Sequence, residues 1–397
     1  MKVAIVTNIP YPNGMAAANR ISCYAEALLL GGAECEVIAY RRTERYGVTP
    51  KNTAGRGLAG NVPFRYVSGT PLRGSNAIKR KLGDLKDKTQ LLRYVWRELH
   101  RGDALLLYIF SDPLYATLLC LLSRIREIKC TGDLCEIPYG TTTASMRNKM
   151  GRFIETRFLL PLLDGLIPIS EELSVYASKY VSKRCRIQKI PILVDFEKYD
   201  LEERSHEADV PYIFHSGTLT EQKDGILGMV EAFGLAVAEL SSPVKMVCTG
   251  RMEDAREAEQ LRALINKYGL EDKIVFTGFL SNDELTDYLS KASIVIINKY
   301  RTEQNRYCFS TKLGEYMAAG KAIIITAVGE AMNWLEDGKD CLVVEPGDSS
   351  RLSAAVVRLF NESDLRIRIS ENAKYECRKF FDFRAWSDLF VSFYKSL

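Results

Sequence analysis

Histidine is scarce in this sequence, and its scarcity excludes several kinds of catalytic site. The 397 residues include three histidines, His100, His206 and His215. None lies in a nucleophile-elbow motif or near other metal ligands, which argues against a Ser-His-Asp triad and against a zinc centre. The ten cysteines are scattered and form no C-x-x-C pair, so we expect reduced, buried thiols and no disulfides.

Long hydrophobic runs are also missing. The longest apolar stretch, residues 104–122, is interrupted by Ser111, Asp112 and Pro113, so it predicts a strand, a turn and a helix instead of a membrane span. The opening MKVAIVTNIPYPNG predicts a short strand and a Pro/Gly turn, and its apolar run is too short for a signal peptide. We therefore expect a cytoplasmic protein.

Charge is distributed unevenly between the two halves of the chain. Residues 1–200 contain 30 Lys and Arg against 19 Asp and Glu, whereas residues 201–397 contain 24 against 31. Much of the basic excess lies between Lys79 and Arg101, where basic residues alternate with apolar ones, including Trp96, at helical spacing. Two interpretations fit: a solvated surface helix, and a helix that binds an anionic membrane surface. No nucleic-acid-binding motif accompanies the charge, so we expect no nucleic-acid partner.

Strands and helices alternate along the chain, which predicts an α/β fold with parallel sheets covered by helices on both faces. The alternation occurs twice, and residues 190–210 between the two runs lose periodicity and gain charge, which indicates two domains. Residues 41–75 are expected to form loops around one short strand. The expected strands are 3–7, 34–40, 64–67, 104–110 and 167–170, followed by 212–215, 245–249, 273–276, 294–297, 322–326 and 341–344.

The segment from Ser310 to Asp348, STKLGEYMAAGKAIIITAVGEAMNWLEDGKDCLVVEPGD, carries the strongest local signal. Ser310 and Thr311 are N-cap residue types, helix formers follow, and Gly320 ends the helix before a buried strand. Free N–H groups at such a helix start can bind a diphosphate, and Glu315, one turn inside, could accept both hydroxyls of a ribose. The alternative for Glu315 is a solvated carboxylate favoured near the positive end of a helix.

The succession S-x-K-x-x-E-Y-x-A-x-G-K, V-G-E, D-G-x-x-C-L-V and E-P-G-D resembles the carboxyl-terminal signature of family 4 retaining glycosyltransferases. The resemblance covers most of residues 165–350. It implies the GT-B fold, in which two Rossmann-like doubly wound domains face each other across a cleft. We expect an acceptor-side domain at residues 1–200, a nucleotide-sugar-binding domain at 201–378, and a helix at 379–397 that crosses back to the first domain. The apolar pattern of that helix fits equally well a terminal helix packed on the second domain.

The resemblance also implies a nucleotide-diphosphate sugar as donor substrate, with no cofactor and no metal. Gly217, Thr218 and Lys223 lie in a segment similar to the phosphate loop of the family, where a glycine lets the backbone approach a phosphate. Two positions depart from the usual pattern: Thr218 replaces an arginine, and Asp224 replaces a glycine. One cation is thus absent, so Lys223, Lys312 and the helix start are expected to bind the diphosphate.

Further donor-side candidates come from other loops. Arg251, just after the strand-ending Gly250, could substitute for the missing arginine. Phe279 lies in the loop expected to face the nucleotide base. Gly14 is either an ordinary turn glycine or a residue that approaches the donor phosphate from the first domain. Tyr307 occupies a position where the family often has a glutamate, so we expect the sugar contact to come from Asn305, Arg306 or the backbone of 308–310.

Glu136 ends a strand-like stretch, and such positions gather at the cleft of open α/β sheets. We favour it over Asp133 as the carboxylate that orients the acceptor hydroxyl, because a Pro-Tyr-Gly turn follows it. Either residue could instead be a polar loop residue without chemistry. The predicted catalytic residues are thus Glu136, Lys223 and Asn305.

The resemblance implies a metal-independent, retaining glycosyltransferase of the hexosyltransferase type, acting on a glycan or lipid-linked acceptor in surface polysaccharide synthesis. No acidic D-x-D-like strand end is present, as a metal-dependent enzyme of the other common glycosyltransferase fold would need. Two alternatives fit the two departures from the family pattern: a catalytically inactive nucleotide-sugar-binding subunit, and a nucleotide-sugar epimerase on the same fold.

Overall fold

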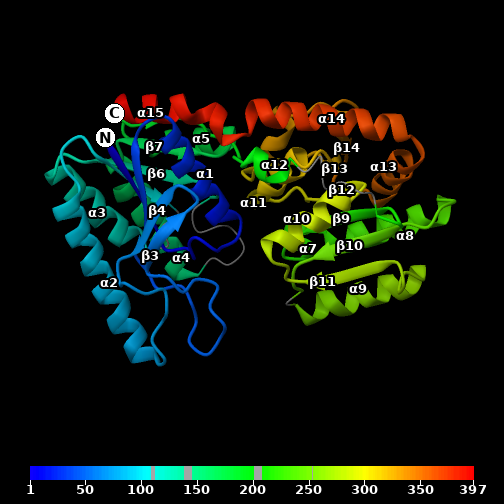
Figure 1. Cartoon of the computed structure of the whole chain (residues 1–397), viewed down its shortest axis with the longest axis horizontal. Helices are drawn as coiled ribbons and strands as arrows, with labels where there is room; N and C mark the ends of the chain where they lie inside the picture. Colours follow the sequence, from blue (N-terminus) through cyan, green and yellow to red (C-terminus); the bar gives the residue numbers. More distant parts are fainter. Residues whose placement is uncertain (109–111, 138–144, 201–207, 253) are drawn as a thin grey trace. The chain divides into compact units, whose positions relative to one another are not determined.

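The computed structural model describes residues 1–108, 112–137, 145–200, 208–252 and 254–397. Contacts divide the chain into two compact units. Unit 1 contains Met1–Leu193 and Phe383–Leu397, and unit 2 contains Val194–Asp382. Each unit contains one sheet with helices packed around it (Figure 1). Within the described ranges, no helix combines the length and the apolar character that a membrane crossing requires.

Unit 1 is built on an eight-stranded sheet in the order β3-β4-β2-β1-β5-β6-β7-β8. Neighbouring strands are parallel except for the β3–β4 hairpin. The strands are β1 Lys2–Thr7, β2 Glu34–Ala39, β3 Arg56–Ala59, β4 Val62–Tyr66, β5 Ala104–Tyr108, β6 Lys129–Leu134, β7 Gly165–Pro168 and β8 Arg186–Ile187. The helices are α1 Ala16–Leu30, α2 Ala77–Glu98, α3 Pro113–Ile125, α4 Met146–Ile154, α5 Glu171–Ser178 and α15 Ser387–Lys395, with short π or 3-10 segments at Glu155–Leu159, Leu160–Leu162 and Phe383–Trp386.

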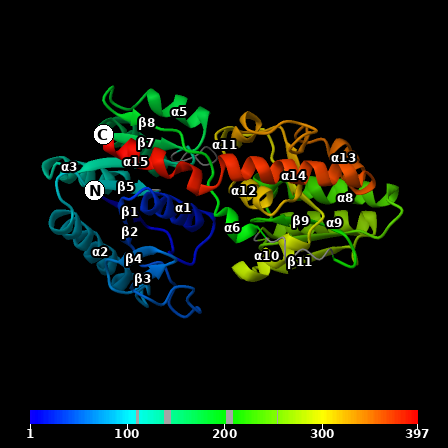
Figure 2. The ribbon, with the colours of Figure 1, turned by 45° about the horizontal axis from the view of Figure 1, so that its top comes forward.

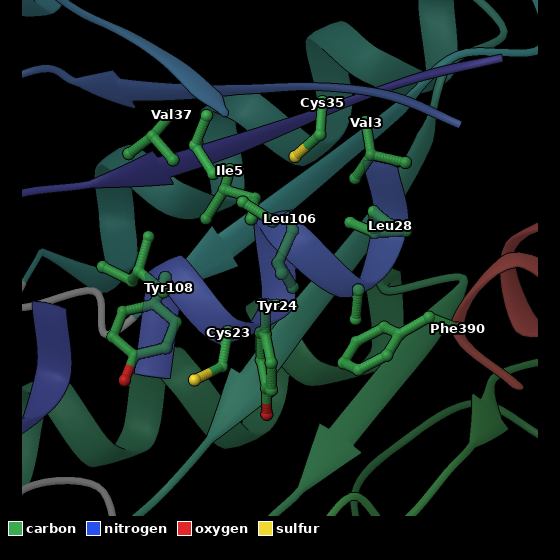
Figure 3. Close-up of a cluster of buried hydrophobic side chains, with 14 of the residues drawn as sticks. Val3, Ile5, Cys23, Tyr24, Leu28, Cys35, Val37, Leu106, Tyr108 and Phe390 are labelled. Atoms are coloured by element: carbon green, nitrogen blue, oxygen red, sulfur yellow. The ribbon is translucent and has the colours of Figure 1, made fainter. Parts of the chain in front are cut away.

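The core of unit 1 joins the sheet to the last helix of the chain (Figure 3). Val3 and Ile5 of β1 and Leu106 of β5 are fully buried beneath α1. Tyr24 of α1 meets Phe390 of α15, with ring centroids 4.8 Å apart. Aromatic side chains bury large areas, so this contact fixes the terminal helix on α1 within unit 1.

Several segments of unit 1 differ from the prediction. Residues 41–75 contain two strands, because β3 forms an antiparallel hairpin with β4 across the Gly60–Asn61 turn. The basic segment is helical as predicted, but over Ala77–Glu98. The strand expected at 104–110 ends at Tyr108, and residues 109–111 lie outside the described ranges. The stretch after residue 379 is not one helix, since a 3-10 turn precedes α15.

Unit 2 has a six-stranded, all-parallel sheet in the order β11-β10-β9-β12-β13-β14. The strands are β9 Tyr212–Ser216, β10 Lys245–Thr249, β11 Ile274–Gly278, β12 Ile294–Ile297, β13 Ala322–Thr326 and β14 Leu342–Val344. The helices are α6 Phe196–Tyr199, α7 Glu221–Asp224, α8 Ile226–Glu239, α9 Ala255–Tyr268, α10 Asn282–Lys291, α11 Glu303–Arg306, α12 Thr311–Ala318, α13 Ser349–Asn361 and α14 Ser363–Phe380, with a 3-10 turn at Glu330–Asn333.

Sequence explains why the central strands of unit 2 are predictable. β12, with the sequence IVII, and β13, with the sequence AIIIT, are buried at every position. Continuous apolar runs of this kind are typical of parallel strands that helices cover on both faces. Figure 2 shows α14 running alongside α12, and these two helices are in contact. Unit 2 therefore has the Rossmann-like arrangement that the sequence predicts.

Candidate active site

The loops after β9, β10 and β11 meet at one edge of the unit 2 sheet, because these strands are parallel neighbours. Ligands of open α/β sheets bind at this carboxyl edge. Gly217 N donates a hydrogen bond to Thr249 O at 2.9 Å, and Gly250 N donates to Gly278 O at 2.9 Å. Gly250 has φ +131°, and a Cβ there would come within 1.8 Å of Gly217 O, so this close approach of two loops requires glycine.

Gly217 makes room for an ion pair at this edge. Lys312, in the first turn of α12, forms a salt bridge with Asp224, the last residue of α7. A Cβ on Gly217 would lie 2.5 Å from Lys312 Nζ and 2.6 Å from Asp224 Oδ2. The ion pair therefore connects the two segments that the sequence indicates as phosphate-binding. That Gly217 approaches a phosphate stays a prediction.

Thr218 completes the surroundings of the Asp224 carboxylate. Its backbone N and its Oγ1 donate hydrogen bonds to Asp224 Oδ2 at 2.8 and 2.9 Å. Burial raises the pKa of Asp224, but the Lys312 charge and the hydrogen bonds outweigh burial and hold the pKa well below its ordinary value. Burial also lowers the pKa of Lys312, and attraction to Asp224 opposes that effect. Each member of the pair thus favours the charged form of the other.

His215 lies next to this ion pair and was not among the predicted site residues. Its side chain is buried, and Nδ1 is 3.0 Å from Ile296 O. A carbonyl only accepts, so Nδ1 carries the proton and Nε2 presents a lone pair. Nε2 is 3.7 Å from Asp224 Oδ1 and has no hydrogen-bond partner among the described residues. Burial, helped by the Lys312 charge, lowers the pKa of His215 to about 4.

Helix α12 carries the residues that the sequence predicts to bind the ribose and the phosphates. Ser310 is at its N-cap position, and the Ser310 side chain makes no capping hydrogen bond. Thr311 begins the helix, and Tyr316 on its buried face accepts a hydrogen bond from Ser216 N at 2.9 Å, which ties α12 to the end of β9. Glu315 is half-buried one turn into the helix, and its charge raises the pKa of Lys312. The helix start therefore lies at the same edge as the β9 loop.

Three of the residues predicted to bind the donor substrate are exposed around this edge. Lys223 lies on α7 with an exposed side chain, and its carbonyl accepts from Lys299 Nζ at 3.2 Å. Arg251 follows β10, and Phe279 follows β11 with 64% of its surface exposed. Their strands are adjacent, so the structure brings these residues to the sheet edge that holds Gly217. Each is accessible to a ligand.

Asn305, which the sequence predicts to contact the sugar, is buried and hydrogen-bonded within its own loop. It is 4% exposed, its Nδ2 donates to Tyr300 O at 2.9 Å, and its backbone N donates to Thr302 Oγ1 at 3.1 Å. These contacts commit the amide to holding the loop before α12. A second loop contact was missed from sequence: Tyr300 donates to Glu221 Oε1 at 2.5 Å, which joins this loop to α7. Neither contact leaves a signal in the local sequence pattern.

The unit 1 candidates separate into a buried and an exposed carboxylate. Asp133, at the end of β6, is buried and accepts from Tyr24 Oη at 2.8 Å, with Arg20 Nη2 at 3.6 Å. It is therefore part of the core. Glu136 is exposed, while the Pro-Tyr-Gly turn expected after it, residues 138–140, lies outside the described ranges. At Gly14 a Cβ would be 2.6 Å from Pro10 O, so the turn itself requires glycine.

No group of three or more His, Cys, Asp or Glu side chains within the described ranges is arranged to hold a metal ion. The Asp224 carboxylate at the sheet edge instead contacts Lys312 and Thr218, and His215 lies beside it. The chemistry that this edge offers is anion binding by lysine ammonium groups and backbone N–H groups, with Glu315 as a hydrogen-bond acceptor.

Sequence comparison assigns this region to a known family model. Residues 210–362 match the model described as Glycosyl transferases group 1. The lipopolysaccharide core biosynthesis glycosyltransferase LpsD of Rhizobium meliloti is 31% identical over 142 residues, which cover 36% of this chain and 39% of that protein. The alpha-D-kanosaminyltransferase of Streptomyces kanamyceticus is 27% identical over 177 residues, 44% of this chain and 42% of that protein. The matches thus span about two fifths of these relatives.

Structural comparison extends over the whole chain. The sucrose-phosphate synthase of Thermosynechococcus elongatus has a TM-score of 0.74 at 16% identity, covering 100% of this chain and 98% of that one. HepE of Anabaena, in complex with UDP and glucose, has a TM-score of 0.71 at 16% identity, with both chains fully covered. The chain therefore has the GT-B fold, and most of its second unit corresponds to the Glycosyl transferases group 1 model.

Proposed function

We propose that the protein is a family 4 retaining glycosyltransferase of the hexosyltransferase type, which transfers a sugar from a nucleotide-diphosphate sugar to an acceptor hydroxyl. One observation carries the proposal: Lys312 at the start of α12 lies against Gly217 and Asp224 of the β9 loop, with Glu315 one turn further along the same helix. The family match over residues 210–362 supports the same reaction class.

The donor diphosphate binds where the positive groups converge. The α12 start contributes N–H groups and the positive end of the helix dipole, and Lys312 contributes an ammonium group within the first turn. Asp224 neutralises part of the Lys312 charge. The exposed Lys223 and Arg251 therefore supply the remaining positive charge, which replaces that of the arginine absent at Thr218. These cations stabilise the charge that develops on the leaving diphosphate.

The nucleoside is held on either side of the diphosphate. Glu315 accepts the ribose hydroxyls, and the exposed Phe279 offers its ring to the base. HepE, similar in fold, has been solved with UDP-glucose, so uridine donors are the first to test. No metal or cofactor takes part in this proposal. Retention of the anomeric configuration rests on the family resemblance.

The acceptor is a glycan or a lipid-linked sugar of a surface polysaccharide, and Glu136 orients its hydroxyl. Similarity over part of the chain to a lipopolysaccharide core glycosyltransferase supports this class of acceptor. The protein is cytoplasmic and acts at the inner face of the membrane, with the basic helix α2 facing anionic lipid. Nucleic acid is not a partner.

A thermal-shift screen of nucleotide sugars tests the proposal, followed by a turnover assay with the tightest binder. We expect one donor to raise the melting temperature and to be consumed, with α-linked product from an α-linked donor. Failure of all donors to bind would contradict the proposal.

A second candidate is a nucleotide-sugar-binding subunit without turnover, which the contact between Thr218 and Asp224 at the two departing positions favours. It predicts donor binding without transfer or hydrolysis. A nucleotide-sugar epimerase would instead release the epimeric sugar nucleotide, which the same assay detects by chromatography.

A further inference from the structure

A cavity of about 450 Å³ in unit 1 is lined by charged side chains that are partly or fully exposed to solvent. It lies between the carboxyl end of β2, helix α2, the start of α3 and one side of α4. Arg41 Nη2 pairs with Asp84 Oδ2 at 3.1 Å, and Lys88 forms a salt bridge with Asp112. Both carboxylates are thus matched by a cation.

Arg147 supplies a third cation to the same cavity. Its guanidinium makes no hydrogen bond or salt bridge with the described residues, although its charge helps to lower the pKa of Asp112. Among the described residues, the lining therefore carries one more positive than negative side chain, and Arg147 is the cation left to pair with a ligand. A guanidinium binds phosphate with two parallel hydrogen bonds.

An apolar stripe starts at the rim of this cavity. Leu114, which lines the cavity, is 67% exposed, and Leu118, Leu121 and Ile125 follow it along α3 with 48%, 45% and 72% exposed. Their spacing places them on one side of the helix, opposite the buried face that includes Leu119. The stripe is about 16 Å long at 1.5 Å per residue. That is about half of the roughly 30 Å hydrocarbon thickness of a bilayer.

Helix α4 adds apolar side chains next to the same rim. Met150 lines the cavity and is 55% exposed, and Met146 and Phe153 of the same helix are 77% and 53% exposed. Helices α3 and α4 are in contact, and α2 lies beside α3 in both views of the ribbon (Figures 1 and 2). A charged cavity thus opens beside an exposed apolar surface.

We propose that this cavity binds the phosphate head of a lipid, with Arg147 as the phosphate ligand and the α3 stripe in contact with the acyl chain. The combination of an exposed arginine at the cavity and an apolar stripe beside it matches an amphipathic anion. A second copy of the chain matches less well, because a symmetric contact would bring together two identical surfaces that both carry an excess of positive charge. The use of the bound lipid as an acceptor rests on the proposed function, whereas its binding does not.

Vesicle flotation tests the proposal on the full chain. Phosphatidylcholine vesicles are compared with vesicles that also contain phosphatidic acid, which carries a phosphate monoester. We expect binding to the second kind only. Arg147→Glu should weaken it about tenfold or more, the usual effect of losing a charged hydrogen bond. Arg262→Glu, an exposed arginine on α9, makes the same charge change away from the cavity and should leave binding unchanged.

The stripe is tested by a second matched pair. Leu121→Asn should weaken vesicle binding, whereas Ile367→Asn, at a 51% exposed apolar position on α14, should not. Melting temperatures verify that all four variants fold. Equal binding to both vesicle types, or equal effects within either pair, would overturn the proposal. Binding of inorganic phosphate through Arg147 without any binding of vesicles would also overturn it. So would a Leu121→Asn variant that changes the oligomeric state of the protein but not its binding to vesicles.

Nucleotide-sugar binding is measured on the same samples. A protein that binds donor but not phosphatidic acid vesicles would overturn the lipid site and leave the proposed transferase standing. A protein that binds the vesicles through Arg147 but no nucleotide sugar would overturn the proposed transferase and leave the lipid site standing.

Discussion

Thr218 donates two hydrogen bonds to Asp224, from its backbone N at 2.8 Å and from Oγ1 at 2.9 Å, both to Oδ2. These are the two positions at which the β9 loop departs from the phosphate loop of the family that it resembles. The departures are therefore coupled: the carboxylate at 224 needs a donor at 218, and together they hold Lys312 against Gly217.

A double-mutant cycle tests this coupling. Thr218→Val removes one hydrogen bond to a charged group, which should lower the free energy of unfolding by about 1.5–3 kcal/mol. In an Asp224→Asn background the same change should cost less, because the partner charge is already absent. Urea titrations of the four proteins give the interaction energy, for which we expect about 0.5–3 kcal/mol. Strict additivity would contradict the coupling.

Glu315→Ala should weaken nucleotide binding by roughly ten- to a hundredfold, since a charged hydrogen-bond acceptor contributes about 1.5–3 kcal/mol. The fold should survive, because Glu315 is half-buried on a helix whose other side forms the core. Isothermal titration with the cognate nucleotide measures the change. Glu259→Ala, an exposed glutamate on α9, is the matched control. Identical affinities for the two variants would remove Glu315 from the site.

Lys223→Ala should slow donor turnover more than it weakens binding of the free nucleoside, because the proposed role of its ammonium group is to stabilise the diphosphate. Lys245→Ala, at an exposed position on β10, should change neither. Steady-state rates and nucleoside titrations give the two quantities. Small and equal effects of Lys223→Ala on both would make it an ordinary surface lysine. Turnover should persist in EDTA, and its loss there would contradict a metal-independent mechanism.

His215 should make stability depend on pH. Burial lowers its pKa from 6.5 to about 4 in the folded state, with the Lys312 charge acting in the same direction and Asp224 opposing. Between these pH values the unfolded chain therefore binds more protons than the folded chain. The contribution of His215 to the free energy of unfolding is fully present above pH 6.5 and falls as the pH drops towards 4. The loss amounts to at most about 3 kcal/mol at 1.36 kcal/mol per pKa unit.

His215→Asn is the informative variant for that pH dependence. Its amide nitrogen can replace Nδ1 in donating to Ile296 O, but it does not titrate. The free energy of unfolding, measured between pH 4 and 7, should fall less steeply in the variant. The Asp224 contribution does not overlap with this window, because its folded pKa is lowered and its stabilisation is lost only below about pH 4. Equal slopes in the two proteins would show that His215 is not responsible.

The basic helix α2 should add a salt-dependent attraction to anionic membranes. Replacing the exposed Lys79, Arg80 and Lys81 by Glu removes three charges that each contribute about 1 kcal/mol near such a surface. Binding to phosphatidylglycerol vesicles should fall in this variant and in high salt, since exposed charges are screened over about 8 Å at physiological ionic strength. If equal amounts of protein bind to neutral and anionic vesicles, α2 is a solvated surface helix and not a membrane-binding one.

Local patterns alone determined the two α/β sheets. Ile294–Ile297 and Ala322–Thr326 each contain four consecutive apolar residues, rich in isoleucine, and short runs of this kind are typical of strands buried in a covered sheet. The helix from Thr311 to Ala318 was also predictable, since its N-cap, its helix formers and Gly320 at φ +60° are all local features. The hairpin strand Arg56–Ala59 was missed because it is short and lies at the edge of the sheet with little burial.

The tertiary structure alone decided what the candidate site contains. Lys312 and Asp224 are 88 positions apart, and they meet because β9 occupies the centre of the sheet, where its loop faces the start of α12. His215 was unremarkable in sequence, yet the hydrogen bond to Ile296 O determines its tautomer, and burial beside the charged Lys312 lowers its pKa. Asn305 was predicted from the sequence to be catalytic, but in the folded chain its amide nitrogen donates a hydrogen bond to Tyr300 O. Strand order and burial act between distant residues, so no local period or motif encodes them.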